Sequence, residues 1–210
     1  IGLKQETSVR LEAGALHFLR GPIELDADLG HLGKLFRRGL GALATGETVV
    51  KPVYTGTGEI FLEPSFRHFI LVELAGDPLI CDDGMFVACD AGVEVKAQVN
   101  KVSSGLFGGD GWVQPKLEGT GCVVLSSPVP FEELVRVRLE SDVRKVDGPL
   151  ALARVGDIEL SVEKSTRSLV GSAASGEGLL QVFRGTGEVW LNPAENLFPP
   201  MWGPSAPASG

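Results

Sequence analysis

The chain has 210 residues, and its 19 basic and 27 acidic side chains give a net charge of −8. This balance argues against a protein that coats nucleic acid, because phosphate binding depends on clustered Lys and Arg. No apolar run approaches the roughly 18 residues of a membrane-spanning helix, and charged residues interrupt the first 20 positions, unlike a signal peptide. We therefore expect a soluble protein of the cytoplasm.

Apolar and polar residues alternate over three stretches, and this period of two predicts half-buried β-strands. The three stretches are 23–29, 93–99 and 158–162. Two further strands are expected at 69–74 and 134–139, where similar patterns occur. Residues 1–7 are polar, so the start of the chain lacks an obvious leading strand.

Two sequence blocks return three times in the same order, about 65 residues apart. One block begins at Gly14, Gly84 and Gly148, and the other begins with Gly-Thr-Gly at 56–58, 119–121 and 185–187. Such self-similarity predicts repeated units. We expect one all-β unit over 1–197, made of three internal repeats at about 1–65, 66–128 and 129–197, and a Pro-rich tail over 198–210. Each Gly-Thr-Gly is expected to be a turn that reverses the chain, because glycine readily adopts positive φ.

The blocks also carry a family resemblance. GALHFL with PIELDAD, GMFVACDAGVEVKAQ followed by SSGLFGGDGW, and the closing GEGLLQVFRGTGEVWLNP are similar to the altered-inheritance-of-mitochondria family, a group of unknown function. This resemblance spans 14–193. It implies a fold similar to the tryptophan RNA-binding attenuation protein, with three tandem double-stranded-β-helix-like modules in a pseudo-threefold repeat. It further implies trimeric rings, and it supplies no catalytic residue.

The sequence contains no pattern typical of an enzyme, and we expect neither a catalytic, cofactor nor metal site. Cys81, Cys89 and Cys122 are an odd number of cysteines without zinc-finger spacing, so they are expected to be reduced thiols. The three histidines are scattered. No nucleophile elbow, phosphate loop or dinucleotide fingerprint is present.

Three loops are the predicted interaction elements. In the first copy, 31–48 has apolar residues at helical spacing with basic residues beside them, which predicts a short basic amphipathic helix. Such a helix either lies on its own β core or docks on an anionic membrane surface or an acidic partner. Two glycine-bearing loops stand in the same place in the other copies. The candidate partner or assembly residues of the three loops are Leu35, Phe36, Arg37, Arg38, Leu106, Phe107, Leu169 and Val170.

The favoured function is a non-enzymatic scaffold that forms a ring-like homo-oligomer, expected to be a trimer, and binds a protein or membrane partner through these loops. Fused β units expose strand edges that association would close. One alternative is RNA binding by analogy of fold, which would use Lys51, Lys116 and Arg184 beside Tyr54, Trp112 and Phe183. Another is a cupin-like small-molecule or metal-binding protein. Trp112 and Trp190 are expected in the core, and Glu24, Glu94 and Glu159 either form a ring of carboxylates or solvate an outer strand face.

Overall fold

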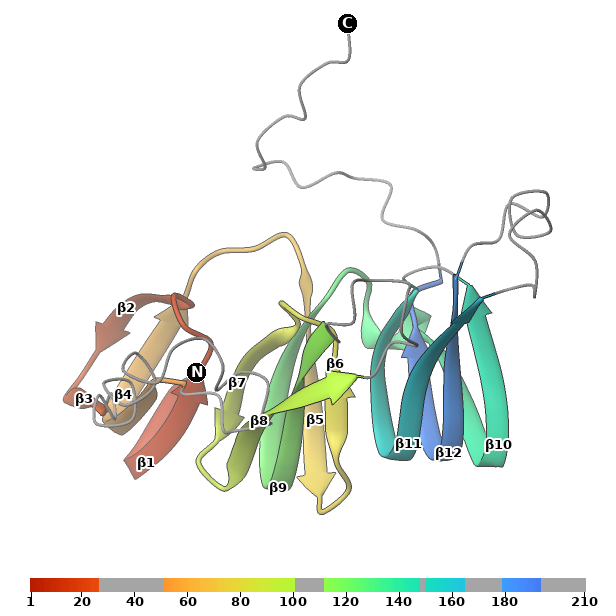
Figure 1. The fold of residues 1–210 in the computed structure, drawn as a ribbon. Coiled ribbons are helices and arrows are strands. Elements are labelled where there is room, and N and C mark those ends of the chain that lie inside the picture. The colour runs from red at the N-terminus through yellow and green to blue at the C-terminus, as the bar shows by residue number, and fades with distance from the viewer. Residues whose placement is uncertain (27–50, 101–111, 148–149, 165–178, 194–210) are drawn as a thin grey trace, which may run out of the picture.

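The computed structural model describes residues 1–26, 51–100, 112–147, 150–164 and 179–193 (Figure 1). These residues form a single twelve-stranded antiparallel sheet, and no α-helix occurs among them. A single turn of 3-10 helix, η2 at Phe131–Glu133, interrupts the strands. The all-β class expected from the period-two alternation is therefore confirmed.

The strands form three groups that follow one another across the sheet, as Figure 1 shows from red to blue. The first group is β1 (Gly2–Leu11), β2 (Leu16–Arg20), β3 (Ile23–Asp26) and β4 (Val53–Leu62). The second is β5 (His68–Ala75), β6 (Leu79–Cys81), β7 (Phe86–Asp90), β8 (Val93–Asn100) and β9 (Trp112–Ser127). The third is β10 (Val135–Asp147), β11 (Ala151–Lys164) and β12 (Leu179–Leu191).

Each group has a central strand that contains Gly-Thr-Gly and is paired along both edges. Strand β4 lies between β1 on one side and β2 with β3 on the other. Strand β9 lies between β5 with β6 and β7 with β8, and β12 lies between β10 and β11. We call β4, β9 and β12 the central strands.

Neighbouring groups are joined by short antiparallel pairings. At the first joint, β1 pairs with β7 through Val9–Asp90, Arg10–Cys89 and Leu11–Ala88. At the second joint, β6 pairs with β11 through Leu79–Val155, Ile80–Arg154 and Cys81–Ala153. The two joints use the same positions relative to Gly-Thr-Gly, because Val9 pairs with Tyr54 and Leu79 with Leu117, each two residues before the motif.

Apolar side chains form three buried clusters, two of which lie at these joints. One cluster combines Leu11 and Val9 of β1 with Ala88 of β7 and so seals the first joint. The largest cluster combines Cys81 of β6 with Ala153 and Trp190 of the third group and seals the second joint. A third cluster, around Phe183, lies within the third group. The expectation that Trp190 belongs to the core is confirmed, whereas the side chain of Trp112 lies outside the described residues.

The alternation predicts most of the buried face correctly. Of the apolar positions of β8 and β11 that it selects, Val99 is half-buried and the others are buried: Val93, Val95, Ala97, Ile158, Leu160 and Val162. It fails at Leu25, whose exposed fraction is 54%. Strand β3 ends one residue later and pairs only with β4 among the described residues, so no neighbouring strand covers this side chain.

The interpretation of Gly-Thr-Gly as a chain-reversing turn is wrong. The motif lies in the middle of each central strand, and its first glycine has a φ of 154° at Gly56, 121° at Gly119 and 135° at Gly185. A Cβ at Gly56 or Gly185 would lie well under 3.0 Å from a carbonyl oxygen of the paired strand or its preceding loop. Glycine is therefore required by close backbone approach.

The expectation that the chain lacks a leading strand is also wrong. Strand β1 begins at Gly2 and pairs with β4 through Gly2–Glu59 and Leu3–Gly58, before an irregularity between Leu3 and Thr7. Strand pairing depends on backbone hydrogen bonds and does not require alternating apolar side chains. The polar composition of 1–7 therefore gave no signal for this strand in the sequence.

Candidate functional site

The loop residues singled out from the sequence lie outside the described residues. They are Leu35, Phe36, Arg37, Arg38, Leu106, Phe107, Leu169 and Val170. The residues that flank their three segments are described, and each pair of flanks is directly paired: Asp26–Val53, Asn100–Trp112 and Lys164–Leu179. Each segment thus connects an outer strand to the central strand of its group, which keeps the three in corresponding places.

An aromatic pair is exposed at one end of the sheet. Phe18 on β2 and Phe61 on β4 are directly paired, and their rings stack at 4.2 Å between centroids with an interplanar angle of 9°. Their exposed fractions are 48% and 39%. Among the described residues β2 pairs only with β4, so its other edge offers unpaired backbone groups beside these rings.

The corresponding pairs in the other two groups are covered by the joints. Counting five residues from the first glycine of the motif gives Phe61, Val124 and Trp190, and their strand partners are Phe18, Ala88 and Ala153. Ala88 lies against Leu11 at the first joint, and Ala153 lies against Cys81 at the second. The Phe18–Phe61 pair thus occupies a joint position at which the described residues supply no joint strand.

The opposite end of the sheet carries the complementary edge. Arg144 of β10 pairs with Phe183, two residues before the motif of β12, just as Val9 of β1 pairs two residues before the motif of β4. Residues 144–146 of β10 therefore correspond to residues 9–11 of β1, which form the first joint. In the described part of the chain, β10 pairs only with β12. Figure 1 shows β2 and β10 at opposite ends of the molecule.

Residues considered for RNA binding are engaged in the chain's own contacts. The ammonium of Lys51 bonds both carboxylate oxygens of Glu12, that of Lys116 lies 2.6 Å from Glu118 Oε1, and Arg184 Nη2 donates to Glu163 at 2.6 Å. Tyr54 and Phe183 are buried in the core. The three glutamates considered as a carboxylate ring, Glu24, Glu94 and Glu159, are exposed, each opposite the residue that precedes Gly-Thr-Gly.

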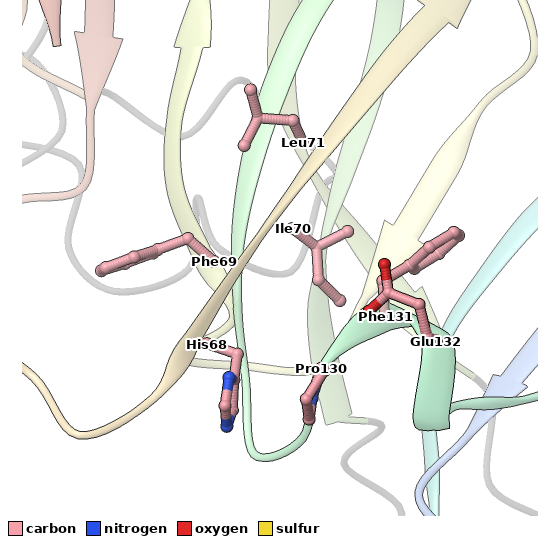
Figure 2. Close-up of a pocket in the computed structure, with 7 residues that line it drawn as sticks. All are labelled: His68, Phe69, Ile70, Leu71, Pro130, Phe131 and Glu132. Carbon is pink, nitrogen blue, oxygen red and sulfur yellow. The ribbon is translucent and has the colours of Figure 1, made fainter.

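A shallow hollow of about 300 Å³ lies between β5 and η2 (Figure 2). Ile70, Pro130 and Phe131 surround it, with the carboxylate of Glu132 at its side, whereas Phe69 points away (Figure 2). The hollow is open to solvent, and its lining includes His68 at the start of β5. It has the form of a surface depression beside a strand edge.

A second groove, of about 280 Å³, lies between the second and third strand groups. Its walls come from β8 and β9 on one side and from the middle of β11 on the other, with Arg154 at the junction. Arg154 is 3% exposed and donates to the side-chain oxygens of Gln114 at 2.8 Å and Asn100 at 2.9 Å. We call this feature the junction groove.

The three cysteines differ in how deeply their thiols are buried. Burial raises the pKa of Cys81 to about 12 and that of Cys89 to about 11, and it also raises the pKa of the half-buried Cys122. All three are free thiols, and the described residues contain no cluster of His, Cys, Asp and Glu that could hold a metal ion.

Thiol labelling is expected to distinguish these residues. At pH 8, a soluble disulfide reagent should modify Cys122 first, while Cys81 and Cys89 should react at least about a hundredfold more slowly, because reaction needs thiolate and local opening of the core. Mass spectrometry of the partly labelled protein checks the order. Fast labelling of Cys81 in folded protein would contradict its place in the second joint.

The fold defines an antiparallel β protein whose strand groups are joined edge to edge and whose two terminal edges are not paired by any other described strand. Residues 1–194 match the family described as mitochondrial biogenesis AIM24, and the chain belongs to this family. This confirms the resemblance found in the sequence blocks. In the part of the chain that the structure describes, no helix has the length and apolar character needed to cross a membrane.

Two Streptococcus pyogenes proteins are similar to the chain. A serotype M6 protein that carries the name uncharacterized protein is 25% identical over 201 residues, which cover 91% of this chain and 79% of that protein. A crystal structure of a protein from the same species superposes with a TM-score of 0.67 at 22% identity, covering 91% of this chain and 86% of the other. The second likeness supports the fold.

Proposed function

We propose that the protein is a non-enzymatic scaffold of three tandem β modules, at about 1–65, 66–128 and 129–197, that is extended by identical chains into a closed ring. The observation that carries the proposal is the repeated joint. One chain uses the same edge-to-edge pairing twice, and its described strands leave one copy of each joint edge unpaired at the two ends of the sheet.

The unused edges fit one another by register. Each internal joint pairs one residue of the first strand with a small residue of the second: Leu11 with Ala88, and Cys81 with Ala153. If two chains formed the same joint, Val146 of one chain would pair with Phe18 of the next. This contact would bury the stacked rings of Phe18 and Phe61, and aromatic side chains contribute strongly to interfaces. The contact is head to tail, so repetition generates a ring when the rotation between chains closes. A trimer is the expected size.

The proposed third joint differs from the first two in charge. It places Arg144 opposite Arg20, whereas the first joint has Val9 opposite Asp90. Arg144 is ion-paired with Asp142, and Arg20 Nη1 lies 3.0 Å from Glu59 Oε2, so both charges are partly compensated. The assembly should therefore be weaker than an internal joint and should strengthen as salt screens the two arginines.

The test is the absolute mass in solution by light scattering coupled to size exclusion. The wild type should have three times the 22.2 kDa of the chain. Phe18→Glu should give the monomer, because a carboxylate cannot be buried unpaired in the joint. Phe66→Glu is the matched control: Phe66 is 95% exposed and lies outside the strands, so this variant should keep the wild-type mass.

Mixing two edge variants tests the head-to-tail arrangement. Val146→Glu should also be monomeric, but it keeps an intact β2 edge, and Phe18→Glu keeps an intact β10 edge. An equimolar mixture should therefore form a dimer with a single joint and no ring. A monomeric wild type, or a Phe18→Glu variant with unchanged mass, would refute the proposal.

A further inference from the structure

The junction groove combines an apolar wall with a buried cation. Ile80, Ile158 and Leu160 supply apolar surface, and Lys116 and Arg154 supply positive charge. Asp157 and Glu159 stand at the exposed side of the same groove. Grooves between structural units in which polar groups converge beside apolar side chains are typical of small-molecule sites.

Arg154 is incompletely satisfied by the chain. Its two Nη atoms bond the amide oxygens of Gln114 and Asn100, and the Asn100 amide in turn donates to Gln114 Oε1 at 2.9 Å. Its Nε is buried without a hydrogen-bond partner. Within the described residues, the ion pairs within 4.0 Å do not include Arg154, so no carboxylate neutralises it.

A buried guanidinium without an anion is costly. Desolvation lowers the pKa of Arg154 to about 10, which shows that the site resists the charged form. The carboxylate of Asp82 is linked to it only through Gln114, whose Nε2 lies 3.4 Å from Asp82 Oδ1. Buried charges in proteins are ordinarily paired, and a bound anion would supply the pairing partner that the described residues do not.

We propose that the junction groove binds a small monocarboxylate with an apolar body. The carboxylate pairs with the guanidinium of Arg154 where that side chain lines the groove, and the apolar body packs against Ile80, Ile158 and Leu160. A guanidinium presents donors in a planar fork that matches a carboxylate. This site is independent of the terminal edges that carry the ring.

Size and charge favour this ligand class over phosphates. A volume of about 280 Å³ has room for on the order of ten heavy atoms, given roughly 30 Å³ for a water molecule. Asp157 and Glu159 repel a ligand that carries two or more negative charges, whereas one negative charge is offset by Arg154. Nucleotides and polyphosphates are therefore excluded by both size and repulsion.

Hexanoate is a suitable probe, and hexanamide is its uncharged control. In protein with ¹⁵N-labelled arginine, hexanoate should shift the Nε signal of Arg154, because the guanidinium gains a carboxylate partner, and hexanamide should shift it much less. Arg154→Gln should weaken hexanoate binding at least about tenfold, because a hydrogen bond to a charged group is lost. Arg138→Gln, which removes an exposed arginine of β10, should bind like the wild type.

A second variant covers the case in which Arg154→Gln does not fold. Val99 is half-buried and lines the groove, so Val99→Trp should fill the space and abolish the hexanoate response while Arg154 stays in place. No Nε shift at millimolar hexanoate, or equal responses to hexanoate in the wild type and Val99→Trp, would overturn the proposal. Equal shifts with hexanamide would also overturn it, because the carboxylate would then have no role.

Discussion

Gly187→Ala is expected to lower the free energy of unfolding by about 3 to 5 kcal/mol. Gly187 is the second glycine of the motif in β12 and has a φ of 151°. A Cβ there would lie well under 3.0 Å from the carbonyl oxygen of Val155 and 3.0 Å from Cδ1 of Ile158. Both the conformation and the paired strand oppose a side chain, and the strand cannot retreat without breaking the β11–β12 pairing. Urea unfolding measures the change.

Gly14→Ala is the matched control for backbone conformation alone. Gly14 has a φ of 80°, but a Cβ added to it meets nothing within 4 Å. Its replacement should cost only about 1 to 2 kcal/mol, the penalty of a left-handed conformation for alanine. Equal losses in the two variants would contradict the close approach of backbones at Gly-Thr-Gly.

The motif shows which part of the fold local sequence can predict. Glycine is enriched both in turns and where two backbones approach closely, and these uses look alike in sequence. At Gly56 the obstructing atom belongs to Pro22, which is far away in the chain. Alternation, in contrast, is a local property of a strand with one wet face, and it correctly located Val93, Val95 and Ala97 of β8 and the buried residues in the second half of β11.

The sequence predicted that strand edges would be exposed, but it did not predict which strands form the terminal edges, because strand pairing joins residues that are far apart in the chain. Whether Phe18 is covered depends on whether another strand pairs with β2, and strand partners are a long-range property. At the joint position, the second and third groups have Ala88 and Ala153 where the first group has Phe18, a large aromatic residue in place of a small one. The repeated blocks show only part of this contrast, because the residues four positions after Gly14, Gly84 and Gly148 are Phe18, Ala88 and Leu152. Only the strand register aligns Ala153 with Phe18.

The sequence gives a weaker signal for the junction groove. Arg154 stands in an otherwise apolar stretch, and its aligned counterpart at the first joint is Cys89, which is also buried. A charged residue at a core position of one copy is a departure that marks a special environment. Its partners Asn100 and Gln114 come from other strands, so only the structure could assemble the site.

Trp190 and Phe61 provide the last prediction, because they occupy the same position in two strand groups. Trp190 is buried in the cluster of the second joint, where its ring lies 5.3 Å from that of Phe131. Trp190→Ala should therefore cost about 3 to 5 kcal/mol of unfolding free energy. Phe61→Ala should cost the isolated chain only about 1 kcal/mol, mainly through loss of stacking on Phe18.

In assembly the order of the two effects should reverse: Phe61→Ala should change the mass in solution more than Trp190→Ala does. Phe61→Ala removes half of the exposed aromatic pair, so its mass should shift toward the monomer while the fold remains stable. Trp190→Ala, measured well below its unfolding transition, should retain the wild-type mass, because neither terminal edge contains Trp190. Unfolding in urea with the chain dilute enough to be monomeric separates the two effects. If Phe61→Ala destabilised the chain as much as Trp190→Ala and left the mass unchanged, Phe61 would belong to the chain's own core, and the open-joint interpretation would fail.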